Sequence, residues 1–321
     1  MGHRAGRPYF PGGRALKADI PVAVIGGYLG AGKTTLVNHL LRHAAGRRIA
    51  ILVNEFGDLP IDEDLIEAEG EDMIAISGGC ICCSFGSDLT AALIKLSELA
   101  PPPDHVVIEA SGVAMPGTVA LSISILSGFV LSGVVVLADG ERVQAQAEDD
   151  YIGDTILRQL SDADVIVHSK TDLHTCAGTV EAVNAWLQAM APQAKIVSTV
   201  RGRVPLEIIL GLTGPGTRPE ASPHADVGYE SLGFRQILPC WPNELAQSLA
   251  TGPYGVIRAK GFVRDTDGTS WLIQTVGSRF EAQRTQTLEP AGLVCIGLRG
   301  SLDAMALQLL IGPASSSVRA S

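Results

Sequence analysis

The sequence predicts an α/β fold in which a mainly parallel sheet is flanked by helices, followed by a small α+β domain. Short apolar runs rich in Val and Ile alternate with helical patterns through the first two-thirds of the chain. Strands that alternate with helices indicate right-handed βαβ units and therefore a parallel sheet. Beyond residue 228 strand-like runs predominate, which is typical of a separate α+β unit.

The elements of the first part can be placed by residue range. We expect strands at 22–25, 49–53, 73–76, 105–108, 134–137, 165–167 and 196–197. We expect helices at 34–43, 87–99, 151–160 and 180–190. The uncharged stretch 110–138 is long enough to cross a bilayer, but serines and glycines interrupt it and its end is a β-branched run. A helix followed by a buried strand explains this stretch better than a membrane span.

The last part of the chain and its boundaries follow from composition. We expect strands at 231–237, 255–263, 270–275 and 293–298, with helices at 244–249 and 302–311. The basic segment before residue 20 has no apolar core, so we interpret it as a loose tail and not as a signal peptide. The expected organisation is a tail at 1–19, a first domain at 20–211, a Gly/Pro/Ser-rich linker at 212–228 and a small α+β domain at 229–321.

Composition narrows the classes of protein. The 321 residues are 46% hydrophobic, enough for a large core, so disorder is not expected. A net charge of −10 argues against nucleic acid as the main partner, although a nucleotide can still be held by backbone amides and magnesium. Six cysteines are too few for a disulfide scaffold, and three of them cluster within four positions. This clustering indicates thiolate chemistry or metal binding in a reducing compartment, the cytoplasm.

A glycine-rich loop lies between the first expected strand and the first expected helix. Gly27-Tyr28-Leu29-Gly30-Ala31-Gly32-Lys33-Thr34 matches G-x-x-x-x-G-K-[ST] at every fixed position and in the required strand-to-helix context. Its amides would hold phosphates, Lys33 would reach the β- and γ-phosphates, and the Thr34 hydroxyl would bind Mg²⁺. The sequence therefore predicts nucleotide contacts from the residues Gly27, Gly30, Ala31, Gly32, Lys33, Thr34 and Thr35.

An acidic residue is expected on the magnesium side of such a site, at the end of a buried strand. Glu109 ends the run 105–108 and precedes Ala110-Ser111-Gly112. We expect Glu109 to hold Mg²⁺ through water, and the Gly112 amide to contact the γ-phosphate at a point where a side chain would obstruct approach. A carboxylate that only caps the strand end is the alternative.

The segment Val165–Asp172 predicts which base is bound. Asp172 stands two positions after Lys170 at a strand end, so its carboxylate can accept the N1 and N2 donors of guanine while the lysine stem covers the ring. Adenine lacks that donor pair, and a buried acceptor left unpaired discriminates strongly. Ser169 stands where the usual N-K-x-D pattern has Asn, which is expected to weaken base affinity or relax specificity. GTP is favoured over ATP; a polar loop after a buried strand is the alternative.

Three thiols follow another expected strand, in Gly79-Cys80-Ile81-Cys82-Cys83. Thiolates suit Zn²⁺ and other transition metals, so we expect Cys80, Cys82 and Cys83 to bind one such ion. Three thiols do not complete a tetrahedral site, and an incomplete set suits a transferable metal better than a permanent one. Buried structural cysteines and redox chemistry are the alternatives.

An acidic stretch from Glu55 to Asp72 contains no Lys or Arg. Most of it is expected to be a solvated face. Glu55, however, directly follows a strand, where we expect it to orient the attacking water or to bind a metal. The expected catalytic residues are therefore Lys33, Glu55 and Glu109.

Together these motifs resemble the CobW-type GTPases, a metallochaperone branch of the P-loop GTPases related to urease and hydrogenase accessory proteins, which includes nitrile hydratase activators. The resemblance covers approximately residues 20–211, and Gly261-Phe262 and Ile296-Gly297 extend it weakly to the C-terminal domain. It rests on the motifs Gly27 to Thr34, Asn54-Glu55-Phe56-Gly57, Gly79 to Cys83, Glu109 to Gly112 and Ser169 to Asp172.

The resemblance implies slow GTP hydrolysis coupled to metal insertion. GTP with Mg²⁺ would order the loops around Glu55 and the cysteines, and hydrolysis would release the metal to a client protein or to a cofactor pathway. The metal is expected to be Zn²⁺, with Co²⁺ or iron as alternatives, and no nucleic-acid or membrane partner is expected. A homo-oligomer is possible. A P-loop kinase or ATPase with structural cysteines and a non-catalytic nucleotide-binding scaffold are the competing interpretations.

Overall fold

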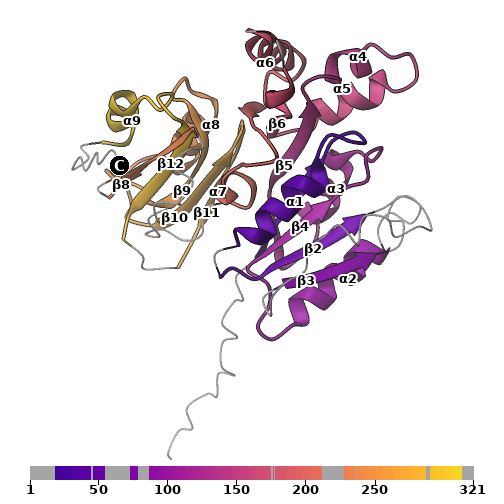
Figure 1. Cartoon of the computed structure of the whole chain (residues 1–321). Coiled ribbons are helices and arrows are strands. Elements are labelled where there is room, and N and C mark those ends of the chain that lie inside the picture. The colour runs from indigo at the N-terminus through magenta and orange to yellow at the C-terminus, as the bar shows by residue number, and fades with distance from the viewer. Residues whose placement is uncertain are drawn as a thin grey trace, which may run out of the picture.

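The computed structural model of the chain describes residues 19–44, 46–54, 73–78, 87–174, 176, 178–211, 228–235, 237–286 and 290–312. The described strands form two sheets that lie in different parts of the molecule (Figure 1). The larger sheet has seven strands and contains the expected first domain, whereas the smaller has five strands and lies towards the C-terminus. The expected linker and N-terminal tail fall largely outside the described residues, so the domain boundaries stay a prediction.

The larger sheet is parallel throughout. Its strands, in the order β3-β2-β4-β1-β5-β6-β7, pair only in parallel. They are β1 (Ile20–Gly26), β2 (Ile49–Asn54), β3 (Met73–Gly78), β4 (His105–Glu109), β5 (Phe129–Asp139), β6 (Val165–Ser169) and β7 (Lys195–Ser198). Every residue of β4 and β6 is buried, as continuous apolar strands covered on both faces require. The expected α/β class is confirmed, and β5 extends well before the predicted run.

Helices cover both faces of this sheet. They are α1 (Lys33–Arg42), α2 (Ser87–Glu98), α3 (Pro116–Ser124), α4 (Val143–Ala147), α5 (Gly153–Ser161), α6 (Thr179–Met190) and α7 (Leu206–Ile209), with a 3₁₀ turn η2 (Thr171–Leu173). One core cluster joins α2, α3, α5 and α6 to the sheet, and a second joins α1 and α7. Helix α1 buries Leu36, Val37, Leu40 and Leu41, at a spacing that places them on one side of a helix. Each such side chain contributes roughly 1.5–3 kcal/mol by leaving water.

The long uncharged stretch forms a helix and then a strand, as predicted. Helix α3 begins at Pro116, where the missing proline N–H costs no helical hydrogen bond, and β5 follows it. Within the part of the chain that the structure describes, no helix is long and apolar enough to cross a membrane.

The smaller sheet is antiparallel, with the strand order β11-β10-β9-β12-β8. Its elements are β8 (Tyr229–Phe234), α8 (Pro242–Thr251), β9 (Val256–Arg264), β10 (Ser270–Val276), β11 (Arg279–Arg284), β12 (Gly292–Leu298) and α9 (Ala304–Ile311). Strand β11 was not predicted, because its sequence RFEAQR is polar and lies at the sheet edge. A core of buried side chains from α8, α9 and the sheet confirms the expected α+β unit.

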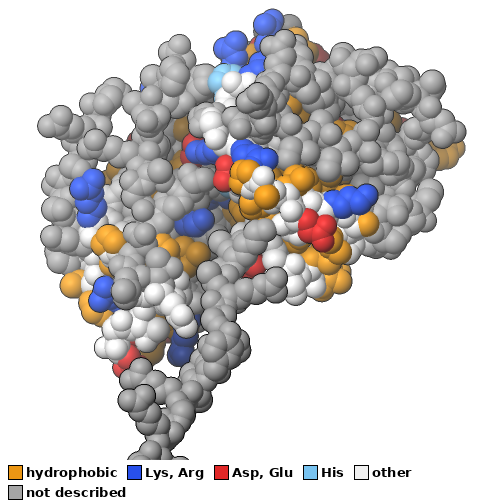
Figure 2. Space-filling view, turned by 90° about the horizontal axis from the view of Figure 1, so that it is seen from below, with side chains coloured by type: hydrophobic (Ala, Val, Ile, Leu, Met, Phe, Trp, Pro, Cys, Tyr) orange, Lys and Arg blue, Asp and Glu red, His pale blue; other side chains and the backbone are white. Residues whose placement is uncertain are grey.

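The two sheets meet at the amino ends of β5 and β6. Arg258 of β9 donates from Nη2 to the Ser132 carbonyl of β5 at 2.9 Å. Arg279 donates from Nε to both carboxylate oxygens of Asp164, at 3.1 and 3.0 Å, just before β6. The C-terminal sheet is therefore anchored away from the carboxyl edge of the parallel sheet (Figure 1). On the face shown in Figure 2, the coloured Lys and Arg side chains lie in several separate places, some of them beside acidic and apolar side chains.

Candidate nucleotide site

The carboxyl edge of the parallel sheet gathers the expected site. Strands β1, β4, β5 and β6 end at Gly26, Glu109, Asp139 and Ser169, and these four strands are neighbours in the order β4-β1-β5-β6. Strands β2, β3 and β4 lie on one side of β1 in the sheet, and β5, β6 and β7 lie on its other side. This change of direction makes the carboxyl edge beside β1 a topological switch point. The expected site residues lie in these strand ends or in the segments that follow them. They are the phosphate-loop residues together with Glu109, Gly112, Ser169, Lys170 and Asp172.

Backbone geometry makes the phosphate loop an anion site. Gly27 has φ +125°, and a Cβ there would lie 2.5 Å from the Leu137 carbonyl oxygen, so only glycine lets the loop pass so close to β5. Gly32 precedes α1 with φ +101° and offers no side-chain cap. The first amides of α1 thus have no capping side chain, and together with the helix dipole they favour an anionic ligand.

Lys33 and Thr34 occupy the first turn of α1. Lys33 donates from Nζ to the carbonyls of Gly27 at 3.0 Å and Tyr28 at 3.4 Å, so its ammonium group lies against the loop. The Thr34 hydroxyl lies 3.4 Å from Oε1 of Glu109, which is buried at the end of β4. Two oxygen groups at the end of a phosphate loop match the preference of Mg²⁺ for hard ligands. These residues therefore fit a magnesium ion.

The segment after Glu109 lies against the phosphate loop. A Cβ on Gly112 would lie 2.9 Å from the backbone nitrogen of Leu29, which shows how closely the two loops approach. Gln159 of α5 is only 1% exposed and donates from Nε2 to the carbonyls of Gly112 at 3.0 Å and Ala114 at 2.8 Å. Sequence reasoning missed Gln159, because a single glutamine within an amphipathic helix carries no recognisable signal.

The segment expected to bind the base is hydrogen-bonded to the phosphate loop. The buried Ser169 hydroxyl lies 2.8 Å from the Ala31 carbonyl and 3.2 Å from that of Ala138, and can donate to either. Lys170 adopts a left-handed conformation (φ 59°), and its Nζ lies 2.7 Å from Oδ2 of Asp139. Asp172 is exposed in η2, so it is available to a ligand at this edge.

Asp139 is a second residue that sequence reasoning missed, although a signal was present. It ends the apolar run of β5 as Glu109 ends that of β4. The side chain is buried, pairs with Lys170 and also accepts from the Glu141 amide at 3.1 Å. Asp139 therefore holds the lysine expected to cover the base.

Two histidines, His168 and His174, flank the loop that contains the residues expected to bind the base. His168 is fully buried, and its Nδ1 lies 2.7 Å from Oδ1 of Asn184 on α6. Its Nε2 lies 3.3 Å from Nε2 of His174, on the other side of η2. Burial lowers the pKa of His168, which favours a neutral ring that donates to Asn184 and accepts from His174. Ser169, Lys170 and Asp172 lie between these two histidines.

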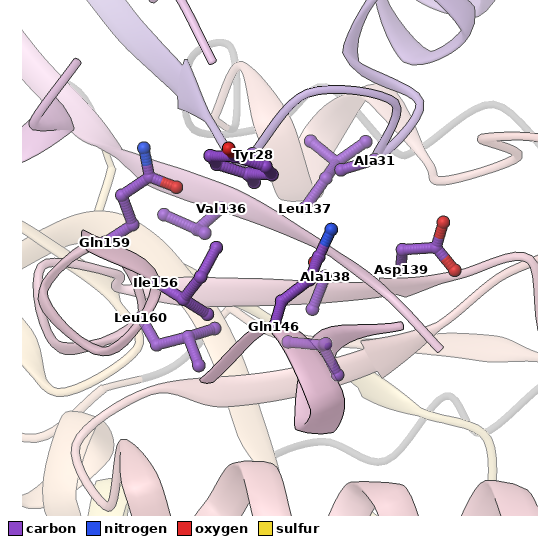
Figure 3. Close-up of a pocket in the computed structure, with 11 residues that line it drawn as sticks. Tyr28, Ala31, Val136, Leu137, Ala138, Asp139, Gln146, Ile156, Gln159 and Leu160 are labelled. Atoms are coloured by element: carbon purple, nitrogen blue, oxygen red, sulfur yellow. The ribbon is translucent and has the colours of Figure 1, made fainter. Parts of the chain in front are cut away.

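A pocket beneath the phosphate loop is lined by residues from both sides of the site (Figure 3). Tyr28 and Ala31 of the loop lie above it, Gln159 and Asp139 lie towards opposite ends, and Ile156 lies below. The residue that holds the Gly112 segment and the residue that holds Lys170 thus line one pocket.

Other expected site residues cannot be placed. Glu55 and the thiols Cys80, Cys82 and Cys83 lie outside the described residues. Among the residues that the structure does describe, no group of three or more His, Cys, Asp or Glu side chains could hold a metal ion.

Comparison with known proteins decides the family. The family model described as "CobW/HypB/UreG, nucleotide-binding domain" matches residues 21–198, more than half of the chain. The chain belongs to the CobW/HypB/UreG family. The expected resemblance is confirmed, and the matched residues contain the whole candidate nucleotide site.

Relatives of this CobW/HypB/UreG chain extend the match. A protein named zinc chaperone CobW from Sinorhizobium sp is 32% identical over 84% of this chain and 88% of its own length. The zinc chaperone YjiA of Escherichia coli is 31% identical over 61% of this chain, which spans 62% of that protein. A crystal structure of Zn(II)-bound YjiA GTPase aligns over 91% of this chain and 98% of that one, with 23% identity and a TM-score of 0.46.

Proposed function

We propose that this chain is a GTP-hydrolysing metallochaperone that binds Zn²⁺ through Cys80, Cys82 and Cys83 and delivers it to a client metalloprotein or cofactor pathway. The observation that carries the proposal is the convergence of phosphate-side and base-side groups at one sheet edge. The cysteine motif begins directly after β3, whose carboxyl end belongs to the same edge of the sheet. In this proposal, nucleotide state acts on the metal loop through this edge of the sheet.

The described residues support roles on the phosphate side. The Thr34 hydroxyl and the Glu109 carboxylate would hold Mg²⁺, which when bound supplies charge that offsets the phosphates. Lys33 would exchange the carbonyls of Gly27 and Tyr28 for phosphate oxygens. The Gly112 amide would contact the γ-phosphate, and Glu55 would orient the attacking water.

Roles on the base side follow from the same edge. Asp172 would accept the guanine donors, and Lys170, held by Asp139, would cover the ring. Ser169 bonds to the phosphate loop, which supports a shared site for base and phosphates despite the departure from N-K-x-D.

Zinc is the proposed cargo. Relatives named zinc chaperones support Zn²⁺ above Co²⁺ or iron. The thiolate cluster suits the same ion without excluding the other two, and it is typical of a reducing compartment such as the cytoplasm. An incomplete set of three thiols suits release to a client better than permanent storage.

Turnover measurements test the proposal. Phosphate release from Mg-GTP and Mg-ATP would be followed with and without Zn²⁺, in the wild type, in Lys33→Ala and in the triple Cys80→Ser, Cys82→Ser, Cys83→Ser variant. We expect slow hydrolysis that prefers GTP, is lost in Lys33→Ala and responds to Zn²⁺ only when the cysteines are present. Rapid phosphate transfer to a small acceptor without a metal effect would instead identify a kinase or ATPase.

A further inference from the structure

Helix α5 holds the segment after β4 at two points. Gln159 donates both amide hydrogens, to the carbonyls of Gly112 at 3.0 Å and Ala114 at 2.8 Å. Asp162, at the end of the same helix, accepts from the Gly117 amide at 2.9 Å. The first point lies next to the phosphate loop, and the second lies at the start of α3.

The contact made by Gln159 is unusual because it places a polar amide on the buried side of a helix. Gln159 lies on the buried side of α5, one residue before Leu160 and near Ile156, both of which pack in the core. A buried amide costs free energy unless its hydrogens are bonded, and here both Nε2 hydrogens find carbonyl acceptors on one loop. The contact spans 47 residues of sequence, so it ties a helix to a loop that belongs to a different βαβ unit.

Gln159 also lies beside the phosphate loop. It lines the same pocket as Tyr28, and Figure 3 shows Gln159 towards one end of that pocket and Tyr28 above it. Leu29 of the phosphate loop also approaches the Gly112 segment, so closely that a Cβ on Gly112 would not fit. The Gly112 segment thus contacts both Leu29 of the phosphate loop and Gln159 of α5.

We infer that Gln159 is a positioning residue for the γ-phosphate, because by holding the Gly112 carbonyl, and with it the peptide between Gly112 and Val113, it fixes the backbone at Gly112, whose own amide would contact the γ-phosphate. The inference rests on the proposed function only in assigning the Gly112 amide to the γ-phosphate. GDP lacks that phosphate, so Gln159 acts on the difference between GTP and GDP and not on nucleotide binding as such. Asp162 anchors the far end of the same segment and leaves this difference unchanged.

Gln159→Met tests the inference, since methionine has a similar length and no amide. Gln146→Met is the matched control, because Gln146 lines the same pocket and its side chain makes no hydrogen bond within the described part of the chain. Affinities for Mg-GDP and for a non-hydrolysable Mg-GTP analogue would be measured for both variants, together with kcat and KM for GTP. Urea unfolding of each variant with GDP bound would report on the fold.

We expect Gln159→Met to bind GDP within about twofold of the wild type and the GTP analogue roughly tenfold more weakly, a coupling of about 1.4 kcal/mol. Its kcat should fall with little change in unfolding midpoint once GDP is bound, whereas Gln146→Met should match the wild type. Equal weakening of GDP and GTP analogue, or equal behaviour of the two variants, would overturn the inference.

Two further outcomes can be told apart from a failure of the inference itself. If Gln159→Met does not fold, Gln159→Glu, which has the same shape but at most one donor, should still weaken the GTP analogue selectively, and failure to do so would overturn the inference. If the wild type itself binds neither guanine nucleotide, the proposed function fails first, and the role of Gln159 falls with it.

Discussion

At the carboxyl edge of the parallel sheet, polar groups surround the phosphate loop, and α1, which follows that loop, has no side-chain cap. These polar groups continue as far as the exposed Asp172. At the amino edge, polar groups are instead covered by the C-terminal sheet. Arg258 is buried there, and burial lowers its pKa to about 10, so it stays charged at neutral pH. The carboxyl edge thus presents its hydrogen-bond donors to a ligand, whereas the amino edge uses its donors in contacts between elements of the chain.

The comparison teaches how one sheet can combine a binding edge with a supporting edge. Ligand binding needs backbone amides that no side chain has already satisfied. Holding a second sheet needs buried charged groups that bond within the chain, as the hydrogen bond from Arg258 to Ser132 and the Arg279–Asp164 pair show. Substitutions of polar side chains at the two edges should therefore separate changes in nucleotide binding from changes in stability.

The largest expected effect comes from the closest backbone approach at the carboxyl edge. Gly27→Ala would place a Cβ 2.5 Å from the Leu137 carbonyl at φ +125°, and strain plus overpacking should cost about 3–5 kcal/mol. Gly30→Ala is the matched control, because at φ +77° its Cβ would meet no atom within 4 Å and should cost about 1 kcal/mol. Urea unfolding of the nucleotide-free proteins measures both, and equal losses would contradict the packing described for Gly27.

Acid should weaken the amino edge through His105 at the start of β4. Burial, followed by the charges of Arg47 and Lys260, lowers the pKa of His105 from 6.5 to about 4. Between these pH values the unfolded chain binds a proton that the folded chain does not, so stability is lost as pH falls from 6.5 to 4. The full loss is about 3 kcal/mol.

The same acid sensitivity should disappear when the imidazole is removed. Neither ring nitrogen of His105 has a hydrogen-bond partner within the described part of the chain, so His105→Met breaks no bond. Unfolding free energies measured from pH 7.5 to 4 should fall less steeply in this variant. Parallel pH profiles for the two proteins would show that the acid sensitivity arises elsewhere.

Base selectivity should depend on Asp172 without a matching change in stability. Asp172→Asn removes the carboxylate that would accept both guanine donors, and the preference for GTP over ATP should fall on the order of 100-fold. Since the side chain is exposed, the free energy of unfolding should change by less than about 0.5 kcal/mol. Competition binding with GDP and ADP measures the preference, and an unchanged ratio would remove Asp172 from the site.

The smallest expected effect compares two buried acids, one at each edge. Asp164→Asn removes the charge paired with Arg279 but keeps an acceptor for the Val134 amide, so it should cost about 1 kcal/mol or less of stability and leave nucleotide affinity unchanged. Asp139→Asn breaks the pair with Lys170 and should weaken GDP binding instead. Urea unfolding and GDP titration of both variants would reveal the reverse pattern if the two edges were assigned wrongly.

The fold and the phosphate side could be predicted because their signals are local in the sequence. Buried parallel strands need continuous apolar runs, and the phosphate loop needs glycines and a lysine at fixed spacing. The seven strands of the parallel sheet follow from the first rule, although the polar β11 of the second sheet does not.

The remaining parts depend on contacts between distant residues. Gln159 meets Gly112 across 47 positions, and Arg258 meets Ser132 across 126, and neither pairing leaves a periodic pattern in the sequence. The Lys170–Asp139 pair depends on β5 and β6 being neighbours, which the order of elements along the chain does not fix.

Metal titration in each nucleotide state tests the central claim most directly. Metal-free protein would be titrated anaerobically with Zn²⁺ in the presence of the Mg-GTP analogue, Mg-GDP or no nucleotide, with the triple cysteine-to-serine variant as control. The account predicts a cysteine-dependent gain in Zn²⁺ affinity of at least roughly tenfold, about 1.4 kcal/mol, with the GTP analogue. Equal Zn²⁺ affinity in all three nucleotide states would contradict a GTP-gated metallochaperone.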